Sequence, residues 1–473
     1  MNWNYIKKLS FILVGVVFFF SACRKKDAIA PDNLVNFEIT TIGITAAENS
    51  ATLKLKTTAA VTQNTDVLVR VTAQNAVYGT EFTTSSPINV TTGPEAGTFK
   101  VTIPSGNNEV SFTISKVAGT LYDGDEKLFL DIYSSATPVI IGASKQLVVN
   151  FAELVSTTTL AVVNGGGATY PNKVFIDLSA NRQTTAARTG WDLGFYNGAD
   201  DFRVTLNSSV NMMAKQLSKN DLNAVTAADT VGYSADVAFS QTAPAITQLP
   251  YIDYPDGALT KTAIAAVSAT ATDNKVYIIN RGNSVGTPAP VRGWKKIRII
   301  RNASGGYTLQ HADIAATTFS SVDISKDDAY FFKVVSFETG SAIVEPQKKK
   351  WDITWTYFAN VTNFGAGEVP YMFQDIILIN RNVQIAKVME ATKAFAAFAE
   401  TDIAAQTFLT TQNAFAADWR SGGGPGTAPA VRTDRYYIIK DGDNNYYKIR
   451  FTALTQNSER GYPAYESVLV KKG

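Results

Sequence analysis

Apolar and polar residues alternate with a period of two over residues 36–153. Three of these stretches carry their apolar residues at Ala51, Leu53 and Leu55, at Val67, Val69 and Val71, and at Val110, Phe112 and Ile114. Such alternation buries one face of a strand and exposes the other. A turn-forming cluster at 104–108 separates neighbouring stretches. The pattern therefore predicts a β-sandwich over residues 36–155.

A segment rich in Thr, Val and Gly at 155–168 marks a boundary, and two versions of one plan follow it. The first version contains VFIDLS at Val174, WDLGF at Trp191, VYIINRG at Val276 and WKKIRIIRN at Trp294. The second contains FFKVVSFETG at Phe331, WDITW at Trp351, YYIIKDGDN at Tyr436 and YYKIRF at Tyr446. The matching order predicts an internal duplication, with strand-built units at about 174–310 and 331–470 within a domain at 160–473.

One stretch has a helical composition, the Ala-rich region from Ala391 to Trp419. Thr401 and Asp402 form a plausible cap between two short helices there. The fold class predicted from the whole pattern is all-β, with an N-terminal sandwich, a larger duplicated β-rich domain and few short helices.

The composition excludes several classes of function and site. The 473 residues carry a formal net charge of only +2, so no electrostatic footprint for nucleic acid is present. One Cys and one His exclude a disulfide framework and a Cys/His zinc site. No nucleophile–base pairing is visible, so we expect a binding protein rather than an enzyme. Paired carboxylates, as in a glycosidase, are not excluded by the sequence.

The first residues follow the pattern of a bacterial lipoprotein signal. Lys7 and Lys8 precede an apolar run at 11–20, and two small residues precede Cys23. We expect 1–22 to be a signal peptide, Cys23 to be acylated and 23–35 to be a tether. An ordinary transmembrane anchor is the alternative, although the apolar run is short for a membrane span.

The charged stretch Arg24–Asp27 resembles the export signals of surface lipoproteins in Bacteroidetes. That resemblance implies an outer-membrane or cell-surface location, with the lipid anchor holding the protein to the outer membrane.

The N-terminal region resembles the Calx-beta type of sandwich in its YGTEF, VSFTIS and DGDEKLFLDI segments. The resemblance implies a calcium site, since carboxylates clustered at one end of a sandwich suit calcium. The candidate ligands are Glu48, Glu81, Asp123, Asp125 and Glu126. An ordinary hairpin turn at DGDE is the structural alternative.

Residues from about 160 to 473 resemble the HmuY family. The match is carried by Trp191-Asp192, Trp351-Asp352, Glu345-Pro346, the VPY at Val369–Tyr371 and the strand pattern that ends at Phe451. The resemblance implies a lipoprotein that captures haem or a related ligand and passes it to an outer-membrane receptor, with a TonB-dependent receptor as the expected partner. From the residues alone, each Trp-Asp pair indicates a packed core Trp with a turn-closing Asp, or else a Trp that stacks on a ligand.

Haem iron needs axial ligands, and a single His cannot supply a pair of them. The candidate ligands are Met212, Met213, His311 and Met372. Each also has a structural interpretation, because Met fills core gaps and His311 lies in an alternating strand. The rival hypothesis is a non-haem surface lipoprotein that binds glycans or a partner protein through its Tyr and Trp side chains.

The lipoprotein hypothesis is tested by the substitution Cys23→Ser. Because only this thiol can carry the lipid, the variant should remain an unprocessed precursor and should not incorporate a radioactive fatty acid. Normal cleavage and labelling of the variant would show that the assignment is wrong.

Overall fold

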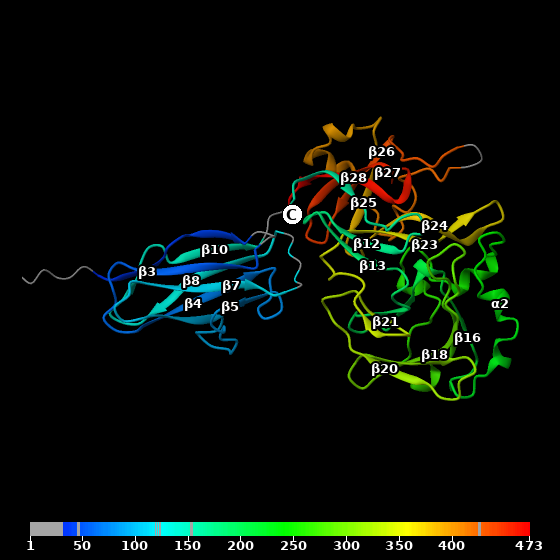
Figure 1. The fold of residues 1–473 in the computed structure, drawn as a ribbon, viewed down its shortest axis with the longest axis horizontal. Helices are drawn as coiled ribbons and strands as arrows, with labels where there is room; N and C mark the ends of the chain where they lie inside the picture. The colour runs from blue at the N-terminus through cyan, green and yellow to red at the C-terminus, as the bar shows by residue number, and fades with distance from the viewer. Residues whose placement is uncertain are drawn as a thin grey trace, which may run out of the picture. The chain divides into compact units, whose positions relative to one another are not determined.

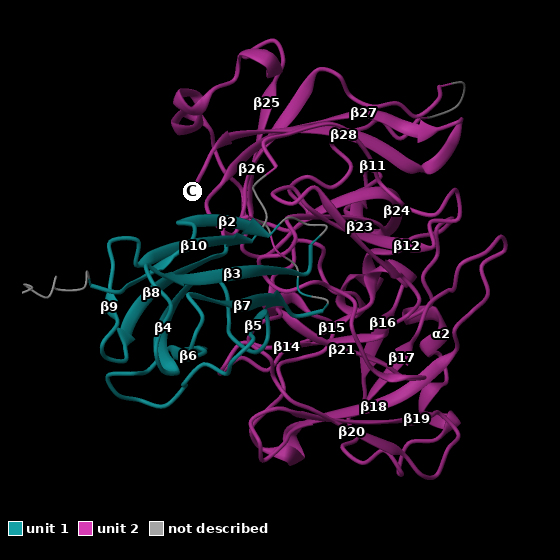
Figure 2. Cartoon of the chain, turned by 60° about the vertical axis from the view of Figure 1, so that its left-hand side comes forward, with its two compact units in different colours: residues 1–120, 126–151 teal, residues 121–125, 152–473 magenta. Residues whose placement is uncertain are grey.

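The computed structural model describes residues 32–44, 48–118, 120, 122, 124–151, 155–423 and 427–473. Cys23 and the predicted signal peptide lie outside the described residues. The chain divides into two compact units, residues 1–120 with 126–151 and residues 121–125 with 152–473 (Figure 2). Nearly all regular structure is strand, so the predicted all-β class is confirmed. Within the described ranges, no helix has the length and apolar character of a membrane span.

Unit 1 is built from two five-stranded sheets (Figure 1). The first sheet has the order β5 (Phe82–Thr84), β7 (Glu109–Lys116), β3 (Ser50–Thr57), β1 (Leu34–Phe37) and β9 (Ile140–Ile141). The second has the order β2 (Thr41–Ile44), β10 (Gln146–Phe151), β8 (Lys127–Ser135), β4 (Thr65–Gln74) and β6 (Thr98–Ile103). In β3, burial alternates along the strand, so Leu53 and Leu55 enter the core while Thr52 faces water.

Unit 2 contains two five-stranded and two four-stranded sheets, each named here by its strands. The β25–β28 sheet has the order β11 (Thr157–Val162), β28 (Glu459–Lys471), β27 (Tyr446–Gln456), β26 (Arg435–Lys440) and β25 (Gln384–Met389). The β16–β20 sheet has the order β16 (Met213–Gln216), β17 (Tyr277–Asn280), β18 (Trp294–Arg301), β19 (Tyr307–Asp313) and β20 (Ser320–Ile324). The β12–β23 sheet has the order β13 (Arg182–Ala187), β12 (Asn172–Asp177), β23 (Ile353–Asn363) and β24 (Glu368–Ile379). The β14–β21 sheet has the order β15 (Val204–Leu206), β14 (Leu193–Tyr196), β21 (Phe332–Ser336) and β22 (Gly340–Ala342).

The strand orders of the four sheets correspond in pairs. If β11 to β19 are matched one by one with β20 to β28, the β25–β28 sheet maps onto the β16–β20 sheet, and the β12–β23 sheet maps onto the β14–β21 sheet. We call the two strand sets the first and second repeats. The two five-stranded sheets of unit 2 thus share one strand order, and so do its two four-stranded sheets.

The repeats exchange strands. The β12–β13 hairpin of the first repeat pairs with β23 of the second, and the β21–β22 hairpin of the second pairs with β14 of the first. In Figure 1 the green strand β12 accordingly lies beside the yellow strand β23. Because each four-stranded sheet needs hairpins from both repeats, neither repeat can complete its sheets alone.

The two Trp-Asp turns hold the exchanged strands with the same contacts. The Asp192 carboxylate accepts the backbone N–H of Phe337 at 2.8 Å, and the Asp352 carboxylate accepts that of Leu178 at 2.8 Å. The backbone N–H of Asp192 donates to the Val335 carbonyl, and that of Asp352 donates to the carbonyl of Ile176. In each turn an Asp of one repeat therefore satisfies the backbone of a strand from the other repeat.

A buried Asn completes each turn. The Asn207 amide donates to the carbonyls of Arg188 and Trp191 at 2.7 and 2.9 Å. The Asn380 amide donates to the carbonyls of Lys348 and Trp351 at the same two distances. Both Asn side chains are fully buried. The register fixed by these contacts makes Asn207 and Asn380 equivalent positions.

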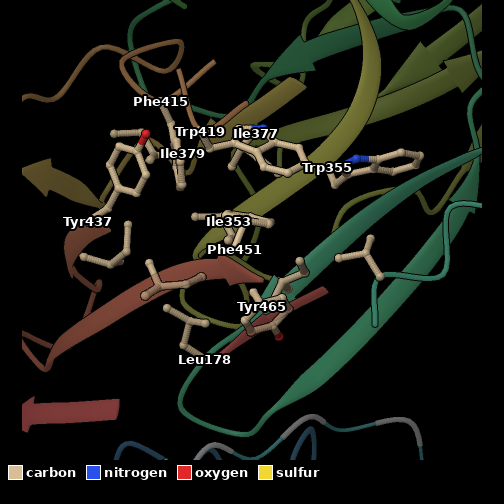
Figure 3. Packing of buried hydrophobic residues seen from close by; sticks show 14 of the residues in the cluster. Leu178, Ile353, Trp355, Ile377, Ile379, Phe415, Trp419, Tyr437, Phe451 and Tyr465 are labelled. Atoms are coloured by element: carbon tan, nitrogen blue, oxygen red, sulfur yellow. The ribbon is translucent and has the colours of Figure 1, made fainter. Parts of the chain in front are cut away.

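Each four-stranded sheet packs on one of the five-stranded sheets. Between the β12–β23 sheet and the β25–β28 sheet, Trp355 and Ile353 share a core with Trp419 and Phe451 (Figure 3). The rings of Trp419 and Phe451 lie 4.3 Å apart between centroids. Between the β14–β21 sheet and the β16–β20 sheet, Leu193 and Phe195 share a core with residues of β17 to β19. These two cores leave the opposite faces of the four-stranded sheets for other contacts.

The two short helices predicted across Ala391–Trp419 are formed, but both are 3₁₀ helices, and the Asp402 carboxylate accepts the backbone N–H of Ala399 before the second one. They are η6 (Phe395–Ala397) and η7 (Glu400–Ala405). The Lys448 ammonium donates to the carbonyls of Phe395 and Phe398, which a longer helix would have used. Both Phe rings pack edge-on against Tyr436, so tertiary contacts override the Ala-rich propensity.

Among the described residues, the remaining short helices are η1 (Ser208–Val210), η2 (Ala227–Thr230), α2 (Tyr233–Asp236), η3 (Ile246–Tyr251), η4 (Leu259–Lys261) and η5 (Ala271–Asp273). All of them lie between β15 and β17. This segment brings polar residues against the four-stranded sheets.

The equivalence of the two turns predicts matched effects of Asn207→Ala and Asn380→Ala. Each change leaves buried carbonyls without a donor, so each should lower the free energy of unfolding of unit 2 by about 1–3 kcal/mol. Urea unfolding followed by Trp fluorescence reports on this unit, since every Trp beyond residue 3 lies in it. Asn223→Ala, at an exposed position, is the control and should change stability by less than about 0.5 kcal/mol. A near-neutral effect at one of the two buried sites would contradict the equivalence.

Candidate ligand pocket at the junction of the two repeats

A pocket in unit 2 is lined by residues of both four-stranded sheets and by the loop at 253–262. Its empty volume is about 870 Å³, which includes the part open to solvent. Equivalent positions of the two repeats face it as the pairs Trp191 and Trp351, Phe175 and Val334, Gly194 and Thr354, Thr205 and Leu378, Lys173 and Phe332, and Ser208 and Arg381. The pocket therefore lies where the repeats meet.

Aromatic side chains form much of its wall. Trp191 and Trp351 are 8% and 4% exposed, so they present only an edge to the pocket. The ring of Trp351 meets that of Phe175 edge-on, with centroids 5.0 Å apart. Among the described residues, neither indole N–H has an acceptor. Buried indole N–H groups usually find a partner, so two orphans at one pocket are unusual.

Lys173 and Glu345 place opposite charges in this apolar setting. Burial lowers the pKa of the Lys173 ammonium, and the nearby Glu345 opposes that shift only in part. Burial raises the pKa of Glu345 to about 7, although Lys173 and the backbone N–H of Phe332 favour its charged form. The Lys173 Nζ lies 5.2 and 5.7 Å from the ring centroids of Phe175 and Trp191. Within the described part of the chain, no acceptor lies within hydrogen-bonding distance of that ammonium.

Asp253 and Arg381 are two further charged residues of the lining. Burial raises the pKa of Asp253 to about 6, against the effect of backbone N–H donors from Leu206 and Ala263 at 2.6 and 3.0 Å. Burial also lowers the pKa of Arg381, whose Nη1 donates to the carbonyl of Gly257. The buried Nε of Arg381 has no acceptor among the described residues.

This arrangement can bind a small molecule through apolar walls and a few charged groups, which is the usual design of a ligand site. Strongly shifted pKa values that converge on one pocket are also typical of functional sites. The charged residues of the pocket are not repeated, although the Trp residues of its walls are. In the equivalent pairs, Lys173 corresponds to Phe332 and Arg381 to Ser208, so each of the two cations occurs in one repeat only.

None of the four predicted haem ligands lines this pocket. Met212 packs in the core beneath the β14–β21 sheet, and Met213 packs with Val237 and Ile252 in a different cluster. Met372 is buried in β24. The structure thus separates Met212 from Met213 and gathers neither Met372 nor His311 with them in a shared cluster.

His311 is half-buried in β19, where its ring lies 5.2 Å from that of Phe337. Burial, and next to it the charge of Lys295, lowers the pKa of this imidazole. His311 therefore lies half-buried on a sheet, and its lowered pKa favours the neutral imidazole.

The calcium candidates belong to the N-terminal region. Asp123 lies outside the described residues. Of the others, Glu81 accepts the backbone N–H of Val77 at 2.7 Å, and Glu126 is buried. Across the described ranges, no group of three or more His, Cys, Asp or Glu side chains has an arrangement that could hold a metal ion.

Sequence reasoning found part of the pocket. It singled out both Trp-Asp pairs, as core and turn elements or else as Trp side chains that stack on a ligand, and Glu345 as part of the family resemblance. Lys173, Asp253 and Arg381 were missed, because single charged residues next to strands give no signal of their own. The only signal available was the mismatch between repeats, where VFIDLS is preceded by Lys173 and the equivalent strand begins with Phe332.

No curated protein matches the chain. Among solved structures, the chain is similar to the apo form of the Calx CBD1 domain, with 13% identity and a TM-score of 0.21 over 26% of this chain and 97% of that one. It is also similar to a putative carbohydrate binding protein from Bacteroides ovatus, with 11% identity and a TM-score of 0.18 over 73% and 93% of the two chains. A putative lipoprotein from Bacteroides fragilis matches with 12% identity and a TM-score of 0.14 over 37% and 96%. TM-scores this low decide neither fold nor ligand.

The remaining comparison concerns protein families. The HmuY protein family matches residues 169–466, a range that includes both Trp-Asp turns, all the exchanged hairpins and every residue of the pocket lining. The match covers more than half of the 473 residues. The chain therefore belongs to the HmuY family.

Proposed function

We propose that this chain is a ligand-capturing surface lipoprotein that holds a small ligand in the pocket between its repeats and passes it to an outer-membrane receptor. Membership of the HmuY family supports a binding role, because its members are generally non-enzymatic binding proteins. The lipoprotein signal ending at Cys23 supports attachment to the outer membrane. A TonB-dependent receptor is the partner that this role would need.

The observation that carries the proposal is the pocket itself. Lys173, Glu345, Asp253 and Arg381 converge on a cavity with aromatic walls. Burying charged groups costs stability unless they are well paired. Lys173 and Glu345 form no direct ion pair among the described contacts, so such a pair does not offset the cost of burying the two charges. Residues that weaken the folded state and face a cavity are typical of binding sites.

Haem is the first ligand that the family suggests, and the pocket residues do not suit its iron. The lining contains no His, Met or Cys. Its Tyr254 already donates to the Glu368 carboxylate at 2.9 Å. A ligand held by the walls and charges of the pocket, rather than through axial metal bonds, fits these side chains better. The non-haem form of ligand capture is therefore the one that we favour.

Co-purification tests the proposal. The full chain, extracted in detergent from the organism that encodes it, should carry a small molecule that mass spectrometry detects after denaturation. Ala258→Trp places a large side chain in the pocket lining and should abolish that signal. Ala227→Trp makes the same change at an exposed position outside the lining and should keep it. Absence of any small molecule from the wild type, or its retention by Ala258→Trp, would refute the proposal.

The absorption spectrum of the same samples decides about haem. We expect no Soret band that responds to His311→Ala or Met372→Ala. A Soret band that either substitution shifts would instead establish metal ligation away from the pocket.

The buried carboxylate of Glu345 predicts a pH-dependent stability effect. Its pKa is about 4.5 unfolded and about 7 folded, so the folded state holds the extra proton between these values and stability falls as the pH rises through them. Glu345→Gln removes the ionised form. The variant should match the wild type near pH 5 and exceed it near pH 8 by on the order of 1–3 kcal/mol. Urea unfolding at the two pH values measures this, and equal stabilities at pH 8 would contradict it.

A further inference from the structure

The pocket is short of hydrogen-bond acceptors. The ammonium of Lys173 has three N–H donors and no acceptor among the described residues. Trp191 Nε1, Trp351 Nε1 and Arg381 Nε also lack acceptors among the described residues, but these three donors are buried away from the open space, so the accessible donor is the Lys173 ammonium. No orphaned acceptor belongs to the lining within the described residues. A molecule that completes this site would bring acceptors.

The acids of the pocket are already engaged. Asp253 accepts backbone N–H groups with both oxygens, from Leu206 and Ala263. Glu345 accepts the backbone N–H of Phe332 at 3.0 Å. These contacts orient the two carboxylates toward the protein. Lys173 is the charged group of the lining that has no hydrogen bond among the described contacts. A cationic ligand would instead have to bind Asp253 or Glu345, which already accept hydrogen bonds from the backbone.

The two repeats show that this cation is an addition. Lys173 occupies the position equivalent to Phe332, and Arg381 occupies the position equivalent to Ser208. The framework of Trp, Asp and Asn is the same in both repeats, so the fold does not require a cation at either place. Both cations lie near Glu345, whose charge acts on each of them. An otherwise repeated, apolar pocket thus carries two cations that the repeated framework does not require.

Resting on the proposed function, we propose that the captured ligand is a small organic carboxylate with an apolar body. The carboxylate accepts from the Lys173 ammonium, and the body packs between the edges of Trp191 and Trp351. An ammonium-to-carboxylate hydrogen bond in apolar surroundings is about twice as strong as a neutral one, which gives the site a preference for the ionised acid over its amide.

Protonation of the neighbouring acid accompanies binding. With Glu345 ionised, the ligand and Glu345 compete for the same ammonium. Because its pKa is about 7, Glu345 takes up a proton readily near neutral pH. The affinity for the carboxylate should therefore increase as the pH falls from 8 to 6, a trend that a neutral ligand would not show.

Three probes of one shape separate the possibilities: phenylacetate, phenylacetamide and phenethylamine. Each is titrated calorimetrically into the full chain in detergent, with a detergent blank. We expect saturable binding of phenylacetate and at least about tenfold weaker binding of the amide, which corresponds to about 1.4 kcal/mol. Phenethylamine should bind most weakly.

Variants assign the effect to one side chain. Lys173→Gln should weaken phenylacetate by about tenfold or more and leave phenylacetamide unchanged, whereas Lys173→Arg should restore much of the loss. Lys387→Gln removes a surface lysine outside the lining and should change neither. Unfolding curves confirm that each variant is folded.

The outcomes separate this inference from the proposed function. Equal binding of acid and amide, a preference for phenethylamine, or no effect of Lys173→Gln would each overturn the carboxylate assignment. If no probe binds while a small molecule still co-purifies with the wild type, the carboxylate assignment fails and ligand capture stands. If no small molecule co-purifies either, ligand capture fails with it.

Discussion

Two aspartates hold unit 2 together by satisfying backbone that belongs to the other repeat. Asp192 accepts an N–H from the strand that ends at Ser336, and Asp352 accepts one from the strand that ends at Asp177. A buried backbone N–H without an acceptor is costly, so these contacts fix which hairpin pairs with which. The exchange of hairpins, the register of both four-stranded sheets and the position of both Trp side chains all follow from this constraint.

The pocket is a consequence of the same exchange. Each four-stranded sheet joins strands of both repeats, so equivalent positions from the two copies face a common space. The aromatic walls are repeated, since Trp191 corresponds to Trp351. The charged residues are not repeated, since Lys173 corresponds to Phe332 and Arg381 corresponds to Ser208. A duplicated scaffold has thereby acquired a site whose charged residues are not repeated, which suits an asymmetric ligand better than a symmetric one.

The sequence predicted what depends on local pattern. Alternation at Leu53 and Leu55 indicated the sandwich strands, and the paired Trp-Asp motifs indicated repeated turns. It could not show that β12 pairs with β23, because strand exchange leaves the order of motifs along the chain unchanged. The Ala-rich stretch after Ala391 indicated helices, yet the capture of two carbonyls by Lys448 depends on a strand more than 40 residues away.

The candidate site was harder to predict than the fold. Met212 and Met213 looked unusual as neighbours, but burial on different sides of a strand separates them into two cores. Lys173 carries no motif, and only its place at a junction of two sheets makes it notable. Functional groups of this kind become visible when the surroundings are known, since burial and the lack of an acceptor are properties of the fold and not of the residue.

The most direct test of ligand capture between the repeats is a crystal structure of the protein purified from the organism that encodes it, without added ligands. The account predicts electron density for a non-protein molecule between Trp191 and Trp351, with an acceptor atom within hydrogen-bonding distance of the Lys173 ammonium. A pocket filled only by ordered water, with such a molecule bound elsewhere on the chain, would contradict it.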